Sequence, residues 1–193
     1  NLNRTRIGGT LPQSVNRTST DELSLLLAGN SLSGTIGEAL KNIHFATLDL
    51  ANNQLEGIVP ALKVSTYLGL NTNRLSGLQP LPDTNDGKLI LWASQNRFTF
   101  DDLLPNADFL RCTSCADPAQ RYASQDTIKA GVNQVIREGD VATYTLAFDN
   151  NLLTNAYSWY KGSSQLSDQT TRTLSLKNFS AQVAGSYSCR ITN

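Results

Sequence analysis

Few residues of this sequence combine the types and spacing that catalysis requires. The single histidine, His44, lies between Ile43 and Phe45, and this apolar setting favours a structural role over that of a general base. Asp101 and Asp102 are adjacent and suggest an acid pair or Ca²⁺ ligands, but a polar turn is the simpler interpretation. A Gly-x-Gly-x-x-Gly phosphate loop is absent. We therefore predict a non-catalytic protein that uses no cofactor and no metal ion.

The cysteines allow several kinds of chemistry. Cys112 and Cys115 form a C-x-x-C pair, and the third cysteine, Cys189, lies far downstream. A redox pair would need a helix start in an α/β fold, and a zinc site would need Cys189 and His44 as further ligands from distant segments. A local disulfide in an oxidising compartment agrees best with the rest of the sequence, and free thiols are the alternative.

Length and composition indicate a β-rich protein of two small modules or one elongated array. The 193 residues are 39% hydrophobic, enough for buried cores, and Asn, Ser, Thr, Gln and Gly supply most of the polar residues, as in β proteins with many turns. The 16 basic and 16 acidic residues balance and are scattered, which argues against nucleic acid as a partner. No apolar run approaches the roughly 18 residues of a membrane span, so we expect no membrane insertion.

A 23-residue repeat organises the first hundred residues. Three copies share alternating leucines, an asparagine, a further leucine and a glycine: Leu25, Leu27, Asn30, Leu32 and Gly34; Leu48, Leu50, Asn53, Leu55 and Gly57; and Leu68, Leu70, Asn73, Leu75 and Gly77. A degenerate copy follows at Leu91, Ala93, Asn96 and Phe98, and a partial copy precedes them with Thr5 in the asparagine position. Steps of 23, 20 and 23 residues between the asparagines are typical of solenoid repeats.

The repeated residues predict a strand and a bend in each coil. Alternate leucines point inward from a short strand, and the asparagine follows where the chain turns away from the sheet. Because a buried amide both donates and accepts, we predict a structural ladder that bonds the backbones of neighbouring coils, formed by Asn30, Asn53, Asn73 and Asn96. With Pro12 and Pro60 after the glycine segments, residues 1–104 resemble plant-type leucine-rich repeats, which implies a solenoid of four to five coils.

Outward positions between the inward leucines line the sheet that such solenoids use for binding. The spacing predicts a central row of Leu26, Asp49, Gly69 and Trp92. Exposed aromatic residues beside small polar ones suit a sugar ring or a peptide, so we predict a concave ligand site at Asp49, Tyr67, Asn71, Trp92 and Ser94. Both aromatic residues also allow a structural interpretation, in which Trp92 packs beneath the next domain.

After the repeats, residues 98–106 predict a capping turn, and residues 105–123 a cap or linker that carries the C-x-x-C pair. From residue 124 to residue 193 the pattern changes to alternating strands separated by turns, expected over residues 141–148, 157–161, 173–176 and 185–191. This pattern favours a β-sandwich.

The second module resembles an immunoglobulin-like domain. Trp159 matches the core tryptophan, and Tyr187, two residues before Cys189, matches the tyrosine corner. Leu146 stands where the first cysteine is expected, so the resemblance implies no intersheet disulfide and a buried free thiol of Cys189 against Trp159. The last strand of the domain is not found, and we expect an open sheet edge and a fragment of a longer protein.

The combination of both modules resembles multidomain surface proteins of Bacteroidetes-type bacteria. That resemblance implies a secreted or cell-surface location, and Thr127 lies in a sequence similar to the O-glycosylation motif of that group. We therefore expect an adhesion or binding module for a protein or glycan ligand. One alternative is a spacer or filament subunit whose open edge is completed by another strand, from its own protein or a further copy. A weaker alternative is a protein that binds ice or a mineral surface.

Overall fold

The computed structural model describes residues 1–15, 21–85, 87–111, 118–123, 125, 136–146 and 155–192 of the chain. The structure is mainly β and divides into two compact units, Asn1–Ile128 and Lys129–Asn193. The predicted cysteine pair, Cys112 and Cys115, and the predicted modification site, Thr127, lie outside the described residues.

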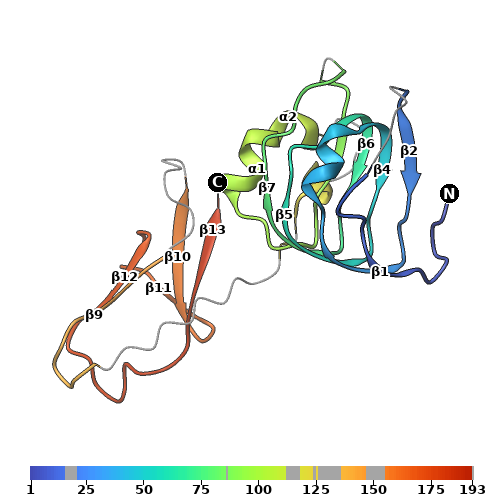
Figure 1. Ribbon diagram of the computed structural model, residues 1–193. Helices are drawn as coiled ribbons and strands as arrows, with labels where there is room; N and C mark the ends of the chain where they lie inside the picture. The colour runs from blue at the N-terminus through green and yellow to red at the C-terminus, as the bar shows by residue number, and fades with distance from the viewer. Residues whose placement is uncertain are drawn as a thin grey trace. The chain divides into compact units, whose positions relative to one another are not determined.

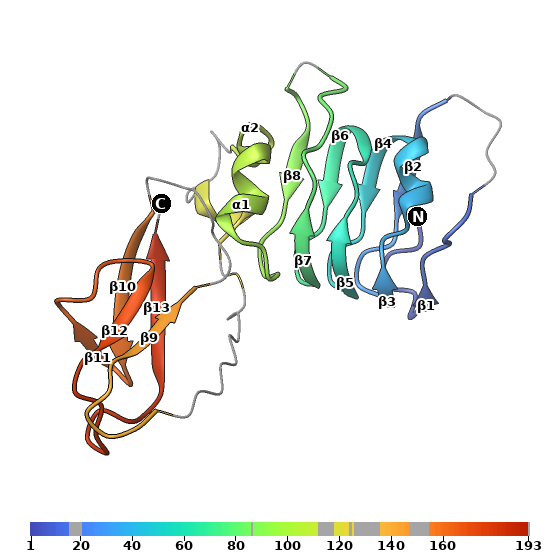
Figure 2. The same cartoon turned by 60° about the vertical axis from the view of Figure 1, so that its left-hand side comes forward.

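The first unit is a β-solenoid of about four turns built from two parallel sheets (Figures 1 and 2). One sheet contains the strands with the inward leucines, in the order β2 (Leu23–Leu26), β4 (His44–Asp49), β6 (Lys63–Gly69) and β8 (Ile90–Trp92). The other contains β1 (Gly8–Thr10), β3 (Ser31–Thr35), β5 (Gln54–Val59) and β7 (Arg74–Leu78). A short 3-10 helix, η1 (Glu38–Asn42), precedes β4.

The second sheet was not predicted, because its strands contain the glycine of each repeat. Gly34 and Gly57 have φ values of 75° and 78°, in the left-handed region that L side chains rarely adopt. A Cβ at Gly34 would lie 3.2 Å from Cγ2 of Thr10 on the neighbouring strand. The glycines therefore permit close approach of these strands, whereas from the sequence alone glycines at these positions indicate turns.

The leucines of the repeat form one continuous core between the two sheets. Leu48, Leu55, Leu68 and Leu91 are 0% exposed. Because each coil buries its leucines against the coils before and after it, the stack is stabilised mainly by contacts between neighbours.

The asparagine ladder connects each coil to the one before it. Nδ2 of Asn96 donates to the carbonyl oxygens of Leu70 at 3.0 Å and Ala93 at 3.2 Å, and its Oδ1 accepts from Leu75 N at 3.0 Å. Asn73 and Asn53 repeat this pattern one and two coils earlier. The expectation that all four amides are buried is wrong: Asn96 is 0% exposed, whereas Asn30, Asn53 and Asn73 are partly buried.

The residue before each ladder position has a left-handed backbone. Asn52, Thr72 and Gln95 have φ values of 55°, 59° and 54°, and Gly29 has 68°. This conformation reverses the chain direction directly before the asparagine whose side-chain amide forms the ladder hydrogen bonds. A β-branched residue such as Thr72 is strained there.

The solenoid continues past residue 104, where the repeat pattern fades. The helices α1 (Phe100–Leu103), η2 (Leu104–Asn106), α2 (Ala107–Leu110) and η3 (Pro118–Arg121) follow β8. Beyond them, Arg121 O accepts from Ala93 N at 2.6 Å, which continues the backbone ladder of the coils. Gln125 then takes the ladder position, since its Nε2 donates to Ala93 O at 3.1 Å and its Oε1 accepts from Phe98 N at 3.0 Å.

The second unit contains five described strands in two antiparallel sheets. One sheet has the order β11 (Ser164–Leu166), β10 (Ala156–Lys161) and β13 (Tyr187–Thr192), and the other pairs β12 (Thr173–Leu176) with β9 (Ala142–Thr145). Strand β11 was not predicted. The core of the unit consists of Ala142, Leu146, Trp159, Leu174 and Leu176.

Cys189 is directly opposite Trp159 in the register of β13 and β10 and packs against this core. The prediction that the Cys189 thiol is buried is only partly correct, because Cys189 is partly buried. Among the described strands, β13 pairs with β10 alone, so its side chains stay partly accessible. Burial nevertheless raises the pKa of the Cys189 thiol, and the thiol is therefore neutral near pH 7.

Candidate functional site

The outward surface of the sheet β2-β4-β6-β8, here called the pocket face, carries the residues predicted to bind a ligand. The register pairs Asp49 with Gly69 and Gly69 with Trp92, in the order that the repeat spacing predicts. A second row places Tyr67 between Thr47 and Ile90. Because the strands are parallel, their carboxyl ends meet at the same edge, and a pocket opens there.

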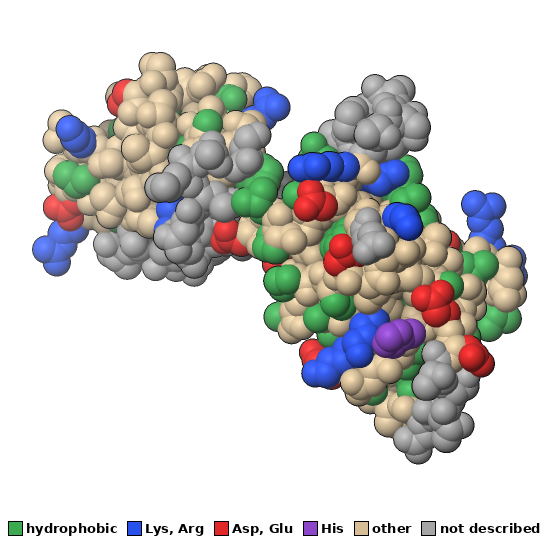
Figure 3. Space-filling view, turned by 90° about the horizontal axis from the view of Figure 1, so that it is seen from above, with side chains coloured by type: hydrophobic (Ala, Val, Ile, Leu, Met, Phe, Trp, Pro, Cys, Tyr) green, Lys and Arg blue, Asp and Glu red, His purple; other side chains and the backbone are tan. Residues whose placement is uncertain are grey.

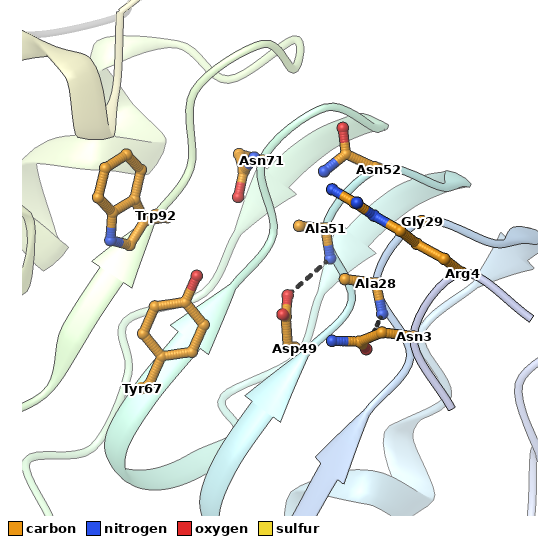
Figure 4. A pocket seen from close by; sticks show the side chains of 10 residues that line it. All are labelled: Asn3, Arg4, Ala28, Gly29, Asp49, Ala51, Asn52, Tyr67, Asn71 and Trp92. Atoms are coloured by element: carbon orange, nitrogen blue, oxygen red, sulfur yellow. Dashed lines mark hydrogen bonds between the residues drawn. The ribbon is translucent and has the colours of Figure 1, made fainter. Parts of the chain in front are cut away.

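The pocket brings together most of the predicted site. From the sheet and the turns after it come Asp49, Ala51, Asn52, Tyr67, Asn71 and Trp92. Figure 4 shows the two aromatic rings at one end, Arg4 at the other, and the Asp49 carboxylate between them. Ser94, two residues after Trp92, is not among the lining residues.

Six lining residues were not part of the predicted site: Asn3, Arg4, Ala28, Gly29, Ala51 and Asn52. Asn3 lies one coil before Ala28, and its Oδ1 accepts from Ala28 N at 2.8 Å. The Arg4 side chain lies over Gly29, where an added Cβ would be 2.8 Å from Arg4 Cγ. The partial first repeat contained the necessary signal, since Asn3 and Arg4 precede Thr5 as Ala51 and Asn52 precede Asn53.

Gly69 leaves the space between the charged and aromatic sides of the pocket open. A Cβ at this position would lie 2.5 Å from Asp49 Oδ1 and 2.9 Å from Tyr67 Cε1. Both distances are shorter than any normal contact, so a side chain at Gly69 would displace Asp49 or Tyr67. The pocket therefore depends on the smallest residue in the central row.

The Asp49 carboxylate and the Tyr67 phenol influence each other. Asp49 Oδ1 accepts from Ala51 N at 3.2 Å, which orients the carboxylate. Burial raises the pKa of Tyr67, the negative charge of Asp49 raises it further, and Arg121 opposes the shift. The phenol is therefore neutral at physiological pH and keeps its hydroxyl proton for donation.

Trp92 is held by a residue of the same unit. Arg121 follows Trp92 in the central row, on the side away from Gly69, and its guanidinium carbon lies 5.8 Å from the centre of the indole ring. The arginine is 8% exposed and donates through Nη1 to the carbonyl of Arg111. This cation–π contact fixes the indole at the end of the pocket. The signal for Arg121 in the sequence was weak, because 29 residues separate it from Trp92.

Several polar groups of the pocket have no partner in the described part of the chain. No hydrogen bond to the side-chain amides of Asn52 and Asn71, to the Tyr67 hydroxyl or to the Trp92 indole nitrogen occurs among the described residues. These groups lie at an open pocket and are free to bond a ligand.

The other candidates for chemistry lie apart from the pocket. His44 is exposed at the start of β4 beside Lys63, and Figure 3 shows it at the surface next to basic side chains. Asp102 accepts from Thr99 N at 2.8 Å and from Thr99 Oγ1 at 2.9 Å, which caps α1. The described residues contain no cluster of three metal-ligating side chains. They also contain no helix with the length and apolarity of a membrane span.

Comparison of the chain with protein-family models, with curated proteins and with solved structures gave no match.

Proposed function

We propose that the chain is a binding module of a secreted or cell-surface protein, in which a leucine-rich-repeat solenoid carries the ligand site and an immunoglobulin-like domain follows it. The pocket face is the binding surface. The bound ligand is a protein or a glycan, and the chain does not transform it.

The hydrogen bonds of the coils support the assignment as leucine-rich repeats. Each ladder amide bonds two successive coils, as Asn73 does through Leu50 O at 3.0 Å and Leu55 N at 2.9 Å. The inward leucines are buried on one side of the same strands. A solenoid with this division leaves the outward positions free to vary for binding.

The contacts of three residues support the immunoglobulin-like assignment of the second unit. Trp159 is 4% exposed and donates through Nε1 to Thr171 O at 2.8 Å. The Tyr187 hydroxyl donates to the carbonyl of Val183, four residues upstream, as expected of a tyrosine corner. Leu146 belongs to the same core as Trp159 and fills the place of the missing cysteine.

One observation carries the proposal for binding: the pocket joins two aromatic rings, a carboxylate and side-chain amides that no described residue bonds, all on one face. Partly accessible aromatic rings beside polar side chains with no partner among the described residues are typical of a ligand-binding surface. The pocket is also poorly suited to hydrolysis. Glycosidases generally use two carboxylates, and Asp49 is the one carboxylate among the lining residues described.

Arrays of immobilised glycans and of peptides test this proposal with the wild type and the variant Tyr67→Ala. We expect binding by the wild type and a loss of about 30-fold in affinity for the variant, the effect of removing a central aromatic contact. Ile90→Ala is the matched control, because Ile90 neighbours Tyr67 in the same row but does not line the pocket. Equal binding by Tyr67→Ala and the wild type would refute this site.

A further inference from the structure

We propose that the pocket binds an uncharged pyranose unit of a glycan, and not a peptide. This inference rests on the proposed function, since it names the ligand class of the same site. It follows from the kinds of groups that line the pocket, from their charge, and from the bonds that the surrounding backbone already makes.

The aromatic residues offer a surface for the C–H face of a sugar. Tyr67 and Trp92 are both partly buried, so each ring keeps a wall of the pocket rigid while part of it stays accessible. Arg121 restrains the indole further from its own side of the row. A rigid ring with one accessible apolar side can pack against the C–H groups of a pyranose and loses little conformational entropy when the sugar binds.

The polar groups of the pocket match hydroxyls. A sugar hydroxyl both donates and accepts, and the amides of Asn52 and Asn71 likewise offer both functions. Asp49 uses Oδ1 for the Ala51 amide, and no described residue bonds its Oδ2, which can accept from a hydroxyl. The neutral Tyr67 hydroxyl supplies a further donor.

A peptide would find few main-chain partners here. The backbone around the pocket is already paired between coils, since Asp49 O accepts from Leu27 N, and Gly69 O from Leu50 N, each at 2.8 Å. Trp92 O accepts from Leu70 N at the same distance. An added strand therefore cannot bond this surface, and the polar lining does not offer the apolar pocket that anchors a peptide side chain.

The charges of the lining favour an uncharged unit. Asp49 and Arg4 are the acidic and the basic lining residue, and Asp49 lies between Arg4 and the two rings. Asp49 lies beside the two rings and would repel a carboxylate or sulfate seated against them. The guanidinium of Arg121 lies over Trp92 and would disfavour a cationic group at the same ring.

The closing experiment uses a glycan array that carries neutral saccharides together with uronic-acid, sialic-acid and sulfated ones, and a peptide array as the second arm. We expect the wild-type chain to bind neutral saccharides. Free monosaccharides of the bound glycan should compete for the protein.

Gly69→Ala tests the position of the sugar. The added Cβ would lie 2.5 Å from Asp49 Oδ1, so the variant narrows the pocket, and we expect saccharide affinity to fall by about tenfold or more. Gly8→Ala is the matched control, because a Cβ there meets only Ser31 at 3.8 Å, an ordinary contact, in the other sheet. If Gly69→Ala lowers the unfolding temperature, Asp49→Ala provides a second variant, for which a comparable loss of saccharide binding is expected because the acceptor for the sugar hydroxyl is removed.

The outcomes separate this inference from the proposed function. Binding only to acidic saccharides, or only to peptides, with loss on Tyr67→Ala would overturn the neutral-sugar inference and leave the pocket face as the binding site. Absence of binding to every saccharide would also overturn it. Saccharide binding that neither Gly69→Ala nor Tyr67→Ala weakens would overturn both.

Discussion

Two asparagines in the turns of neighbouring coils have opposite roles, and their hydrogen bonds decide which. Asn96 is 0% exposed and bonds the backbones of two coils, whereas the Asn71 amide points into the pocket (Figure 4). We predict that Asn96→Ala lowers the free energy of unfolding of the first unit by about 3 kcal/mol, because it leaves several buried backbone groups without partners. Urea denaturation measures this loss.

Asn71→Ala is the control for that experiment. It removes the same amide from an open surface, so we expect a change of about 0.5 kcal/mol or less in stability, together with weaker ligand binding. Equal destabilisation by both variants would contradict the ladder as the source of stability.

Tyr67 titrates above the ordinary tyrosine value of 10.0 because of burial first and Asp49 second. We predict that Asp49→Asn lowers the pKa of Tyr67 without restoring the ordinary value, since burial remains. Ultraviolet pH titration, with Tyr67→Phe to identify the signal, measures the shift. The pKa of Tyr67 is higher in the folded chain than in the unfolded chain. The stability that this difference contributes is fully present below the pKa of the unfolded chain. It is lost as the pH rises through the pKa of the folded chain. An unchanged pKa in Asp49→Asn would place the carboxylate away from the phenol.

The sequence contained most of the site at the scale of single residues. A regular repeat places residues one coil apart side by side, so the spacing alone aligned Asp49, Gly69 and Trp92. It did not reveal Arg121, because the coil that brings Arg121 to Trp92 is longer than the others. It also overextended the site to Ser94, since a row in register does not show where a pocket ends.

At the scale of elements, the left-handed turn before each ladder residue has a cost that depends on residue type. Thr72 has φ 59°, whereas Asn52 occupies the same turn with φ 55°. Asparagine tolerates this region and threonine does not. We predict that Thr72→Asn raises the free energy of unfolding by about 1 kcal/mol and that Asn52→Thr lowers it by a similar amount.

Thermal unfolding of these two variants and the wild type provides the measurement. Thr72 Oγ1 donates to Gln95 Oε1 at 2.6 Å, but this bond is at the surface, where its loss has a small effect. Destabilisation by Thr72→Asn would show that the bond outweighs the backbone strain.

The elements that sequence reasoning missed have a common physical cause. The second sheet depends on glycines that read as turns, and the closing coil depends on Gln125, whose longer side chain reaches the bonds that an asparagine makes elsewhere. Both features arise from contacts between coils. A pattern based on residue identity within one coil does not contain them.

At the scale of the whole molecule, the proposed fold of the second unit can be tested with an engineered disulfide. Leu146 and Cys189 contact the same core in the second unit, and in the proposed immunoglobulin-like domain they take the two positions of the intersheet disulfide. We predict that Leu146→Cys forms a disulfide with Cys189 and raises the stability of this unit by about 2 to 4 kcal/mol. Peptide mapping by mass spectrometry without reduction identifies the bond. Two freely alkylated thiols at these positions would contradict the immunoglobulin-like arrangement.

The chain has two tryptophans, and each serves as a probe of one unit. Trp92 lines the pocket of the solenoid, and Trp159 lies in the core of the second unit. The indole N–H signals in a ¹⁵N-correlated NMR spectrum therefore report on the proposed site and on an internal control. We predict that titration with the neutral saccharide selected by the array moves the Trp92 signal in a saturable manner and leaves the Trp159 signal in place. A saccharide that binds without moving the Trp92 signal, or that moves only the Trp159 signal, would contradict the pocket as the binding site.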